Sequence, residues 1–150
     1  MPSFNVQIDL EAPIRPTESI NKVKAAIKNL FPDSVFDDVS DGTLRATAKS
    51  LNIFKERLGA QAIRAASRRV LRRGLRPGHI IFSLAKQAAF VNRVNFGVDG
   101  PLGDITVLIR TETPEAVIDK LTDKHDYDLP EGRPVGKRPP TDEYLVDPED

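Results

Sequence analysis

Residues 54–73 read FKERLGAQAIRAASRRVLRR, and the periodicity of this stretch decides the fold class. At about 100° per residue, one broad face gathers the apolar side chains Leu51, Phe54, Leu58, Ala62, Ala65, Ala66 and Val70. Another face carries a polar stripe at spacings of 4, 3, 4 and 4 residues: Arg57, Gln61, Arg64, Arg68 and Arg72. Arg69 and Arg73 widen the basic end, and Arg76 follows in the turn. We predict one long basic helix that ends before Pro77-Gly78.

The formal net charge of the 150 residues is zero, but this total conceals three unlike parts. Residues 1–54 carry six basic and seven acidic side chains, a net charge of −1. Residues 55–98 carry ten basic and one acidic, a net charge of +9, and residues 99–150 carry six and fourteen, a net charge of −8. Such asymmetry indicates a surface that meets a polyanion together with an acidic tail. Overall neutrality therefore does not exclude a nucleic-acid partner.

Composition excludes several classes of protein. The absence of cysteine excludes disulfides, thiolate metal sites and cysteine catalysis. No apolar run approaches the roughly 18 residues that a membrane helix needs, and no signal-peptide pattern opens the chain. We expect a soluble, cytoplasmic protein with no membrane partner and no cofactor.

Hydrophobic periodicity elsewhere predicts six short strands and two further helices. The strands are expected near residues 4–10, 35–39, 44–48, 80–84, 94–96 and 105–109. The helices are expected from Thr17 to Phe31 and from Thr113 to about Leu121, and Asp41-Gly42 is a two-residue hairpin signal. Residues 86–91 fit a strand, a bulge or a helical turn equally well. The order β-α-β-β-α-β-β-β-α predicts an α+β domain whose mainly antiparallel sheet has helices packed on one face.

The domain is expected to span residues 1–121 and to be followed by an acidic, proline-rich tail. Residues 122–150 contain five prolines, nine acidic and four basic side chains, and no apolar periodicity. This composition predicts a mobile or loosely packed segment. Its net charge of −5 also predicts that it folds back on the basic helix and competes with a polyanion.

Three short pieces of the chain carry a family resemblance: Lys86-Gln87-Ala88-Ala89-Phe90, Val94-Asn95-Phe96 and Pro101-Leu102-Gly103-Asp104-Ile105. Together with residues 57–74 and the opening from Val6 to Pro16, they resemble an archaeal family of uncharacterised proteins to which RNA binding is ascribed. The resemblance covers roughly residues 4–121. It implies a fold like that of the large-subunit ribosomal protein that binds 5S RNA, and a role in RNA metabolism or ribosome-related processes. It implies no catalytic residues.

The candidate RNA-contacting side chains follow from charge and hydrogen-bonding capacity. Guanidinium groups bridge phosphate oxygens and stack on bases, and amides can both donate to and accept from base edges. The candidates are Arg57, Arg64, Arg68, Arg69, Arg72, Arg73, Arg76, Lys86, Gln87, Arg93 and Asn95. The alternatives are a merely solvated helix face and, for Gln87 and Asn95, amides that satisfy backbone groups at a turn. Phe82, Phe96 and, less clearly, Phe90 are expected to belong to the core.

The sequence favours a non-catalytic RNA-binding protein, with ribonucleoprotein components as further partners. The alternative is a protein-interaction subunit that docks its arginines on an acidic partner or on a second copy of itself. A sheet-mediated homodimer is suggested by Ile81 and Leu108, which fall on the outer sides of their strands. An enzyme is disfavoured because His79 has no partner at metal-ligand spacing and no nucleophile motif beside it. Asp37, Asp38 and Asp41 lack the spacing of a calcium loop, so we expect no metal site.

Overall fold

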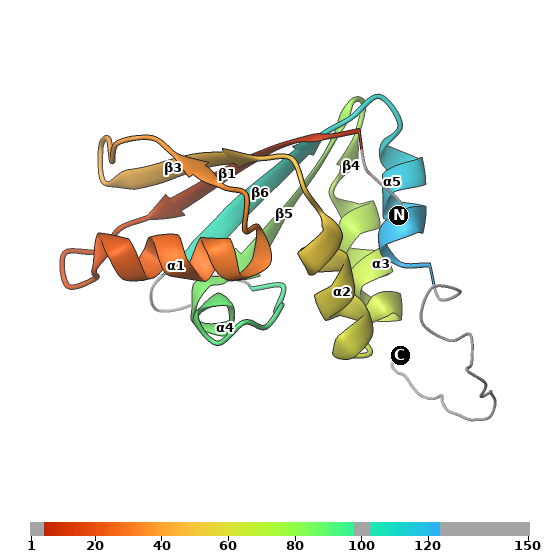
Figure 1. Ribbon diagram of the computed structural model, residues 1–150. Coiled ribbons are helices and arrows are strands. Elements are labelled where there is room, and N and C mark those ends of the chain that lie inside the picture. Colours follow the sequence, from red (N-terminus) through yellow and green to blue (C-terminus); the bar gives the residue numbers. More distant parts are fainter. Residues whose placement is uncertain (1–4, 98–102, 124–150) are drawn as a thin grey trace.

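The computed structural model describes residues 5–97 and 103–123, which form a six-stranded antiparallel sheet with helices against one face (Figure 1). The strands are β1 (Gln7–Pro13), β2 (Val35–Phe36), β3 (Thr43–Ala48), β4 (Leu75–Arg76), β5 (His79–Ala85) and β6 (Asp104–Arg110). The helices are α1 (Ile20–Leu30), α2 (Asn52–Ala60), α3 (Arg64–Arg73), α4 (Lys86–Phe90) and α5 (Pro114–Leu121). The predicted α+β class is confirmed.

The sheet has the strand order β2-β3-β1-β6-β5-β4, so the first and last long strands lie at its centre. Pairing sets Leu10 opposite Val107, and Val107 opposite Phe82, on the face that the helices cover. The alternate residues point to the other face, as the period of two requires. Both edge strands are only two residues long, which leaves little unpaired backbone for another chain to extend.

Phenylalanines tie the helices to the sheet. Phe54 of α2 stacks between Phe31 and Phe82, with ring centroids 5.6 Å apart in both pairs. The ring of Phe96 meets Phe82 edge-on at 5.8 Å. Such offset and edge-to-face pairs add specificity to the burial of apolar area. The prediction that Phe82 belongs to the core is therefore confirmed, and Phe96 and Phe90 are partly buried against it.

The hairpin between β2 and β3 turns where the sequence predicted. Asp41 and Gly42 both have positive φ, 54° and 69°, as a tight hairpin turn of the primed type requires. Backbone hydrogen bonds between Ser40 and Thr43 close the turn.

The predicted strand at residues 94–96 is wrong, and a strand that was not predicted lies elsewhere. Leu75 and Arg76 form β4, which pairs with Ile80 and His79. Val94 cannot pair as a strand residue because the side chain of Gln61 takes both its N–H and its carbonyl oxygen. The ambiguous stretch after residue 85 is the short helix α4.

The predicted single helix over residues 54–73 is also wrong. The chain ends α2 at Ala60 and reverses, and α3 then returns toward the sheet (Figure 1). Ala62 has φ of 58°, the N–H of Ile63 donates to the carbonyl of Leu58, and the N–H of Ala62 donates to that of Gly59. This is the Schellman arrangement that terminates helices. The arginine stripe predicted along one helix is therefore divided between two.

The first helix begins later than predicted, since Ser19 rather than Thr17 is its N-cap and accepts a hydrogen bond from the N–H of Lys22. The last helix matches its predicted range. The predicted tail lies, from residue 124 on, outside the described residues. In the part of the chain that is described, no helix is both long and apolar enough to cross a bilayer.

Candidate nucleic-acid interface

Four of the predicted arginines lie at the C-terminal end of α3, where the helix meets the sheet, and in the adjoining strand β4. Its ten residues contain five arginines and no acid, while Ser67 and Leu71 turn inward and are buried. Arg69, Arg72 and Arg73 are exposed, as is Arg76 in β4. We call these four residues the α3 arginine surface. Arg72 and Arg73 form no ion pair with any residue in the described ranges.

The position of these arginines has a structural reason as well. The last carbonyl groups of a helix carry partial negative charge, which favours cations nearby. One guanidinium nitrogen of Arg76 donates to the carbonyl oxygens of Arg73 and Leu75, at 2.9 Å each, and so closes the C-terminal end of α3. This role accounts for Arg76, but it leaves the side chains of Arg72 and Arg73 facing solvent.

The two remaining arginines of α3 are only partly exposed. Arg68 forms an ion pair with Asp119 at 2.7 Å and donates to the hydroxyl of Thr122 at 3.1 Å. Arg64, at the start of the helix, is half-buried. The charge of Arg68 is partly committed to packing α3 against α5, so Arg68 is a weaker candidate for an external anion than Arg72 and Arg73.

Arg57 and Gln61, which the sequence placed in the same stripe, turn toward the loop after α4. The Arg57 guanidinium donates to the carbonyl oxygen of Asn92 at 3.4 Å. Gln61 accepts from the N–H of Val94 at 2.7 Å and donates to its carbonyl oxygen at 2.9 Å. The predicted contacts Gln87, Arg93 and Asn95 are exposed in the same region.

Lys86 is not placed to meet a ligand from solution. Its side chain is 0% exposed and its ammonium lies 3.1 Å from Glu18. The ammonium also donates to the carbonyl oxygen of Pro13 at 2.6 Å. Sequence reasoning assigned it to the basic surface because a lysine is rarely buried, but a carboxylate partner makes burial tolerable. We therefore leave Lys86 out of the candidate interface.

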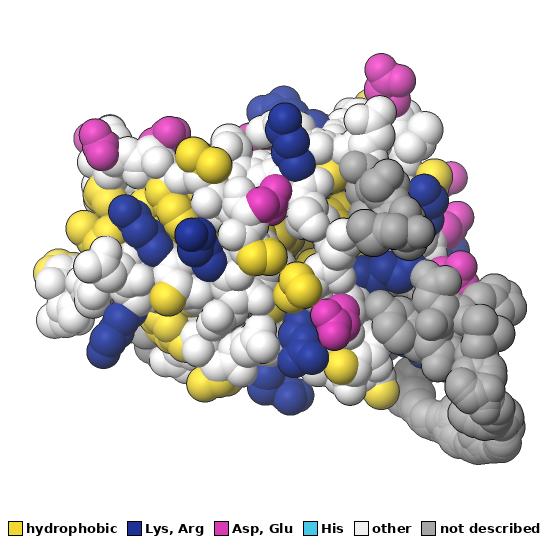
Figure 2. Space-filling model, in the orientation of Figure 1, with side chains coloured by type: hydrophobic (Ala, Val, Ile, Leu, Met, Phe, Trp, Pro, Cys, Tyr) yellow, Lys and Arg dark blue, Asp and Glu magenta, His cyan; other side chains and the backbone are white. Residues whose placement is uncertain are grey.

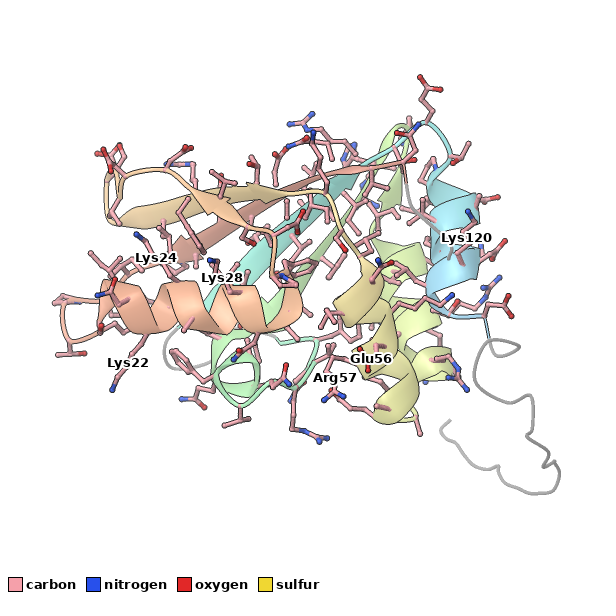
Figure 3. All side chains as sticks on the ribbon, viewed as in Figure 1. Lys22, Lys24, Lys28, Glu56, Arg57 and Lys120 are labelled. Carbon is pink, nitrogen blue, oxygen red and sulfur yellow. The ribbon has the colours of Figure 1, made fainter. Side chains whose placement is uncertain are left out.

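The helix layer also carries lysines that sequence reasoning did not select. Lys22 and Lys28 of α1 are exposed, and Lys24 lies over the ring of Phe36 at 5.5 Å from its centroid. Figure 3 shows Lys24 and Lys28 on one side of α1 and Lys22 on the other, the side on which α4 lies. The signal was present, since residues 20–30 contain three lysines and no acid. The net charge of residues 1–54 did not reveal these lysines, because the aspartates near the hairpin offset them in the sum.

Basic side chains are thus spread over the helix-covered side rather than drawn into one stripe. Figure 2 shows them in blue over α1 and again beside α2 and α4, where one acid interrupts them. Figure 3 identifies that acid as Glu56, next to Arg57.

The uncovered face of the sheet has a different character. Two of its arginines are paired with acids, Arg45 with Glu11 at 3.3 Å and Arg110 with Asp9 at 2.6 Å, while Arg76 stands at its β4 edge, in register with His79. The outward positions of the four long strands hold no phenylalanine, tyrosine or tryptophan. RNA-binding sheets stack bases on exposed aromatic rings. This face therefore lacks the rings that such binding uses, and two of its arginines are already paired.

Within the described residues, no further metal-ligating side chains join His79 or the aspartates near the hairpin. His79 begins β5 and is half-buried, opposite Arg76 and Arg110. Asp37, Asp38 and Asp41 are exposed near the hairpin. Within the described residues, no three His, Cys, Asp or Glu side chains converge as metal ligands.

Comparison with known proteins finds a matching family model, similar archaeal proteins and a similar crystal structure. A family model described as RNA binding matches residues 7–112. The UPF0201 protein of Thermococcus onnurineus is 35% identical over 130 residues, covering 83% of this chain and 96% of that relative. The UPF0201 protein of Sulfurisphaera tokodaii is 36% identical over 147 residues, covering 91% and 99%. The crystal structure of the UPF0201 protein from Methanococcus jannaschii matches with a TM-score of 0.72 and 32% identity, covering 77% of this chain and 98% of that one.

Proposed function

The chain belongs to this archaeal UPF0201 family, and from that premise we propose that it is a non-catalytic RNA-binding protein whose phosphate contacts lie on the helix layer. The observation that carries the proposal is the C-terminal end of α3, where Arg72 and Arg73 are exposed and form no ion pair within the described residues. The family description, RNA binding, names the same class of partner.

The charge composition favours a polyanion over plain solvation. Solvated helix faces normally mix both signs, because opposite charges three or four residues apart stabilise a helix. Helix α3 instead places five arginines in ten residues without an acid. Arginine also suits phosphate better than lysine does, since its planar guanidinium makes two parallel hydrogen bonds to one phosphate.

The test compares RNA affinity at several salt concentrations for the intact protein and for the double variant Arg72→Ala/Arg73→Ala. For single-stranded RNA each neutralised phosphate contributes about −0.7 to the slope of log affinity against log salt. We expect the double variant to bind more weakly at about 0.1 M salt and to lower the magnitude of the slope by about 1.4.

A matched control removes arginines from the opposite side. Arg45 and Arg110 are exposed but ion-paired on the uncovered sheet face. The double variant Arg45→Ala/Arg110→Ala should leave both affinity and slope nearly unchanged. Equal losses from the two double variants would show that binding responds to total charge, and would contradict a helix-layer interface.

A second candidate function is self-association through the uncovered sheet face. Ile81 is 37% exposed and pairs in register with Leu108, and Val35 on edge strand β2 is 67% exposed. Sedimentation equilibrium tests this candidate. A monomer at all concentrations would remove it, and a dimer that Ile81→Lys dissociates would support it.

The remaining sequence-based expectations are part of the proposal. They are the likeness to the 5S-RNA-binding ribosomal protein, a place among ribonucleoprotein components and a cytoplasmic location. RNA recovered and sequenced after purification of the protein from its native cells would test the first two. Incubation of labelled RNA with the protein and Mg²⁺ tests the non-catalytic assignment, since RNA cleavage that His79→Ala abolishes would contradict it.

A further inference from the structure

The loop that follows α4, residues 91–95, is held in place by side chains at the C-terminal end of α2, and the end of α4 that precedes it is held by a side chain of α1. From α2, Gln61 binds both backbone groups of Val94, at 2.7 and 2.9 Å, and Arg57 donates to the carbonyl of Asn92. From α1, the side-chain amide of Asn29 donates to the carbonyl of Ala89 at 2.8 Å. We call residues 91–95 the α4 loop.

The backbone of the α4 loop is fixed from within as well. Asn92 has φ of 63°, the N–H of Arg93 donates to the carbonyl of Ala88, and the N–H of Asn92 donates to that of Ala89. This is a second Schellman arrangement. The carbonyl oxygen of Asn95 accepts from the N–H of Ala85 at 2.7 Å. The loop is therefore set before any ligand arrives, which lowers the entropic cost of binding.

The side chains that this rigid loop presents are turned to solvent. Val91 is 67% exposed, and Arg93, Asn95 and the preceding Gln87 of α4 are exposed too. The side chains of Gln87, Arg93 and Asn95 make no hydrogen bond to the described residues. An apolar side chain, a guanidinium and two amides are thus exposed on a firmly held backbone, and the three polar ones have no hydrogen-bond partner among the described residues.

The surroundings of the α4 loop are basic on both sides. Arg57 lies on the α2 side (Figure 3). Lys22 is seven residues before Asn29 in α1, so it lies on the same face about 10 Å away along the helix. Figure 3 shows its side chain on the side of α1 where α4 lies. The acid in this area is Glu56, and it is exposed.

We propose that the α4 loop is a recognition site for unpaired nucleotides, with Gln87 and Asn95 reading base edges and Arg93 contacting phosphate or stacking on a base. The proposal rests on the proposed RNA-binding function and adds the class of RNA. The major groove of an A-form duplex is too deep and narrow for side chains to read, and its shallow minor groove is recognised mostly by shape, whereas loops and single strands expose their base edges. Arginine phosphate contacts on α3, by contrast, need no unpaired base.

The experiment measures fluorescence anisotropy with two labelled probes, a single-stranded RNA of about 12 nucleotides and the same sequence as a duplex, at about 0.1 M salt. The variant Gln87→Ala/Asn95→Ala should lose about tenfold in affinity for the single strand, within the range of amide–base contacts. It should lose less than about twofold for the duplex, because phosphate contacts are retained. Asn21→Ala, which removes an exposed amide from α1, is the matched control and should change neither affinity.

Gln61 serves as a positioning residue, so its variant separates loop geometry from direct contact. Gln61→Leu removes both hydrogen bonds to Val94 while it keeps a side chain of similar size. We expect a smaller preference for the single strand over the duplex, with unchanged duplex affinity and unchanged circular dichroism. Glu56→Gln should instead tighten binding of the single strand severalfold, since it removes the negative charge beside Arg57.

The outcomes are distinguishable from those that bear on the proposed function. Loss of RNA affinity in Arg72→Ala/Arg73→Ala, together with an unaltered single-strand preference in Gln87→Ala/Asn95→Ala, overturns this inference alone. Poly-glutamate that binds as tightly as RNA, and is equally sensitive to Arg93→Ala, also overturns it in favour of an unselective anion surface. Absence of binding to either RNA overturns both proposals.

Discussion

At the scale of single residues, Gly74 is a position that admits no side chain. A Cβ atom there would lie 1.8 Å from the carbonyl oxygen of Ile81, which is backbone in β5 and cannot swing aside. The carbonyl oxygen of Gly74 also accepts from the N–H of Ile81. The end of the arginine helix is therefore seated directly on the sheet, and the exposure of Arg72 and Arg73 depends on that contact.

We expect Gly74→Ala to destabilise the protein by about 3 kcal/mol or more, because the clash forces α3 away from β5. Urea unfolding followed by circular dichroism measures this change. Gly42→Ala is the control, since φ there is 69° but nothing lies within 4 Å of the new Cβ. It should cost only about 1 kcal/mol, the strain of the left-handed backbone. A loss for Gly74→Ala as small as that for Gly42→Ala would contradict the close packing.

The buried pair of Lys86 and Glu18 predicts a loss of stability without a loss of binding. Lys86→Ala leaves a carboxylate that is only 6% exposed without its cation, and such a change costs about 3–5 kcal/mol. The exposed pair of Arg45 and Glu11 is the control, and Arg45→Ala should cost less than about 1 kcal/mol. Unfolding in urea gives both values, and RNA affinity measured on the folded Lys86→Ala variant should equal that of the parent. If the folded Lys86→Ala variant binds RNA more weakly than the parent does, Lys86 belongs to the interface.

At the scale of elements, local signals located the long strands, although β1 lies three residues later than predicted, and they missed both β4 and the helix break. Alternation set the faces of β1, β5 and β6, and Asp41-Gly42 set the hairpin, because these depend only on neighbouring residues. The break at Ala62 has no such signal. Helices that end in this way usually place glycine at the left-handed position, and here alanine occupies it. The Gln61 contact that accompanies the break joins residues 33 positions apart, which no local pattern reveals.

Substitution of Ala62 by glycine distinguishes two helices from one by the sign of its effect. With Ala62 at φ of 58°, Ala62→Gly relieves left-handed strain and should stabilise the protein by about 0.5–1 kcal/mol. In a continuous helix the same change would destabilise it by about 1 kcal/mol. Thermal unfolding should therefore show a rise of a few degrees in the midpoint. A fall would indicate that residues 54–73 form a single helix in solution.

The sequence predicted which types of residue form the candidate site, but it did not predict how they are arranged. The charge of residues 55–98 correctly identified exposed arginines at positions 69, 72, 73, 76 and 93. It could not separate Arg68, which pairs with Asp119, or Lys86, which pairs with Glu18, because both partners lie more than 50 residues away. The positional role of Gln61 was missed for the same reason.

At the scale of the whole molecule, the sheet divides two surfaces of unlike charge. The uncovered face holds Arg45 and Arg110 in cross-strand ion pairs with acids, whereas the helix layer exposes cations on α1, on α3 and in the α4 loop. A long polyanion that follows the helix layer can meet all three in turn. A partner for the uncovered face needs no net charge, which makes a second copy of the chain compatible with RNA on the other side.

The acidic C-terminal segment, residues 124–150, lies outside the described structure. The point at which the chain leaves α5 determines which arginines this segment can reach. Arg68 of α3 binds both Asp119 and Thr122, so the chain leaves α5 beside the arginine helix. The last ten residues hold five acids and no base. Tethering raises their effective concentration at the α3 arginine surface to about the millimolar range.

Truncation after Asp123 should therefore tighten RNA binding severalfold at about 0.05 M salt, and the gain should vanish above about 0.3 M, where screening weakens the internal competitor. Replacing the five terminal acids by amides in the full chain is the control, and it should reproduce most of the gain because charge rather than length is responsible. Equal affinities of full and truncated protein at low salt would show that the acidic segment does not reach the arginines. A gain that persists at high salt would show that it obstructs RNA by its bulk instead.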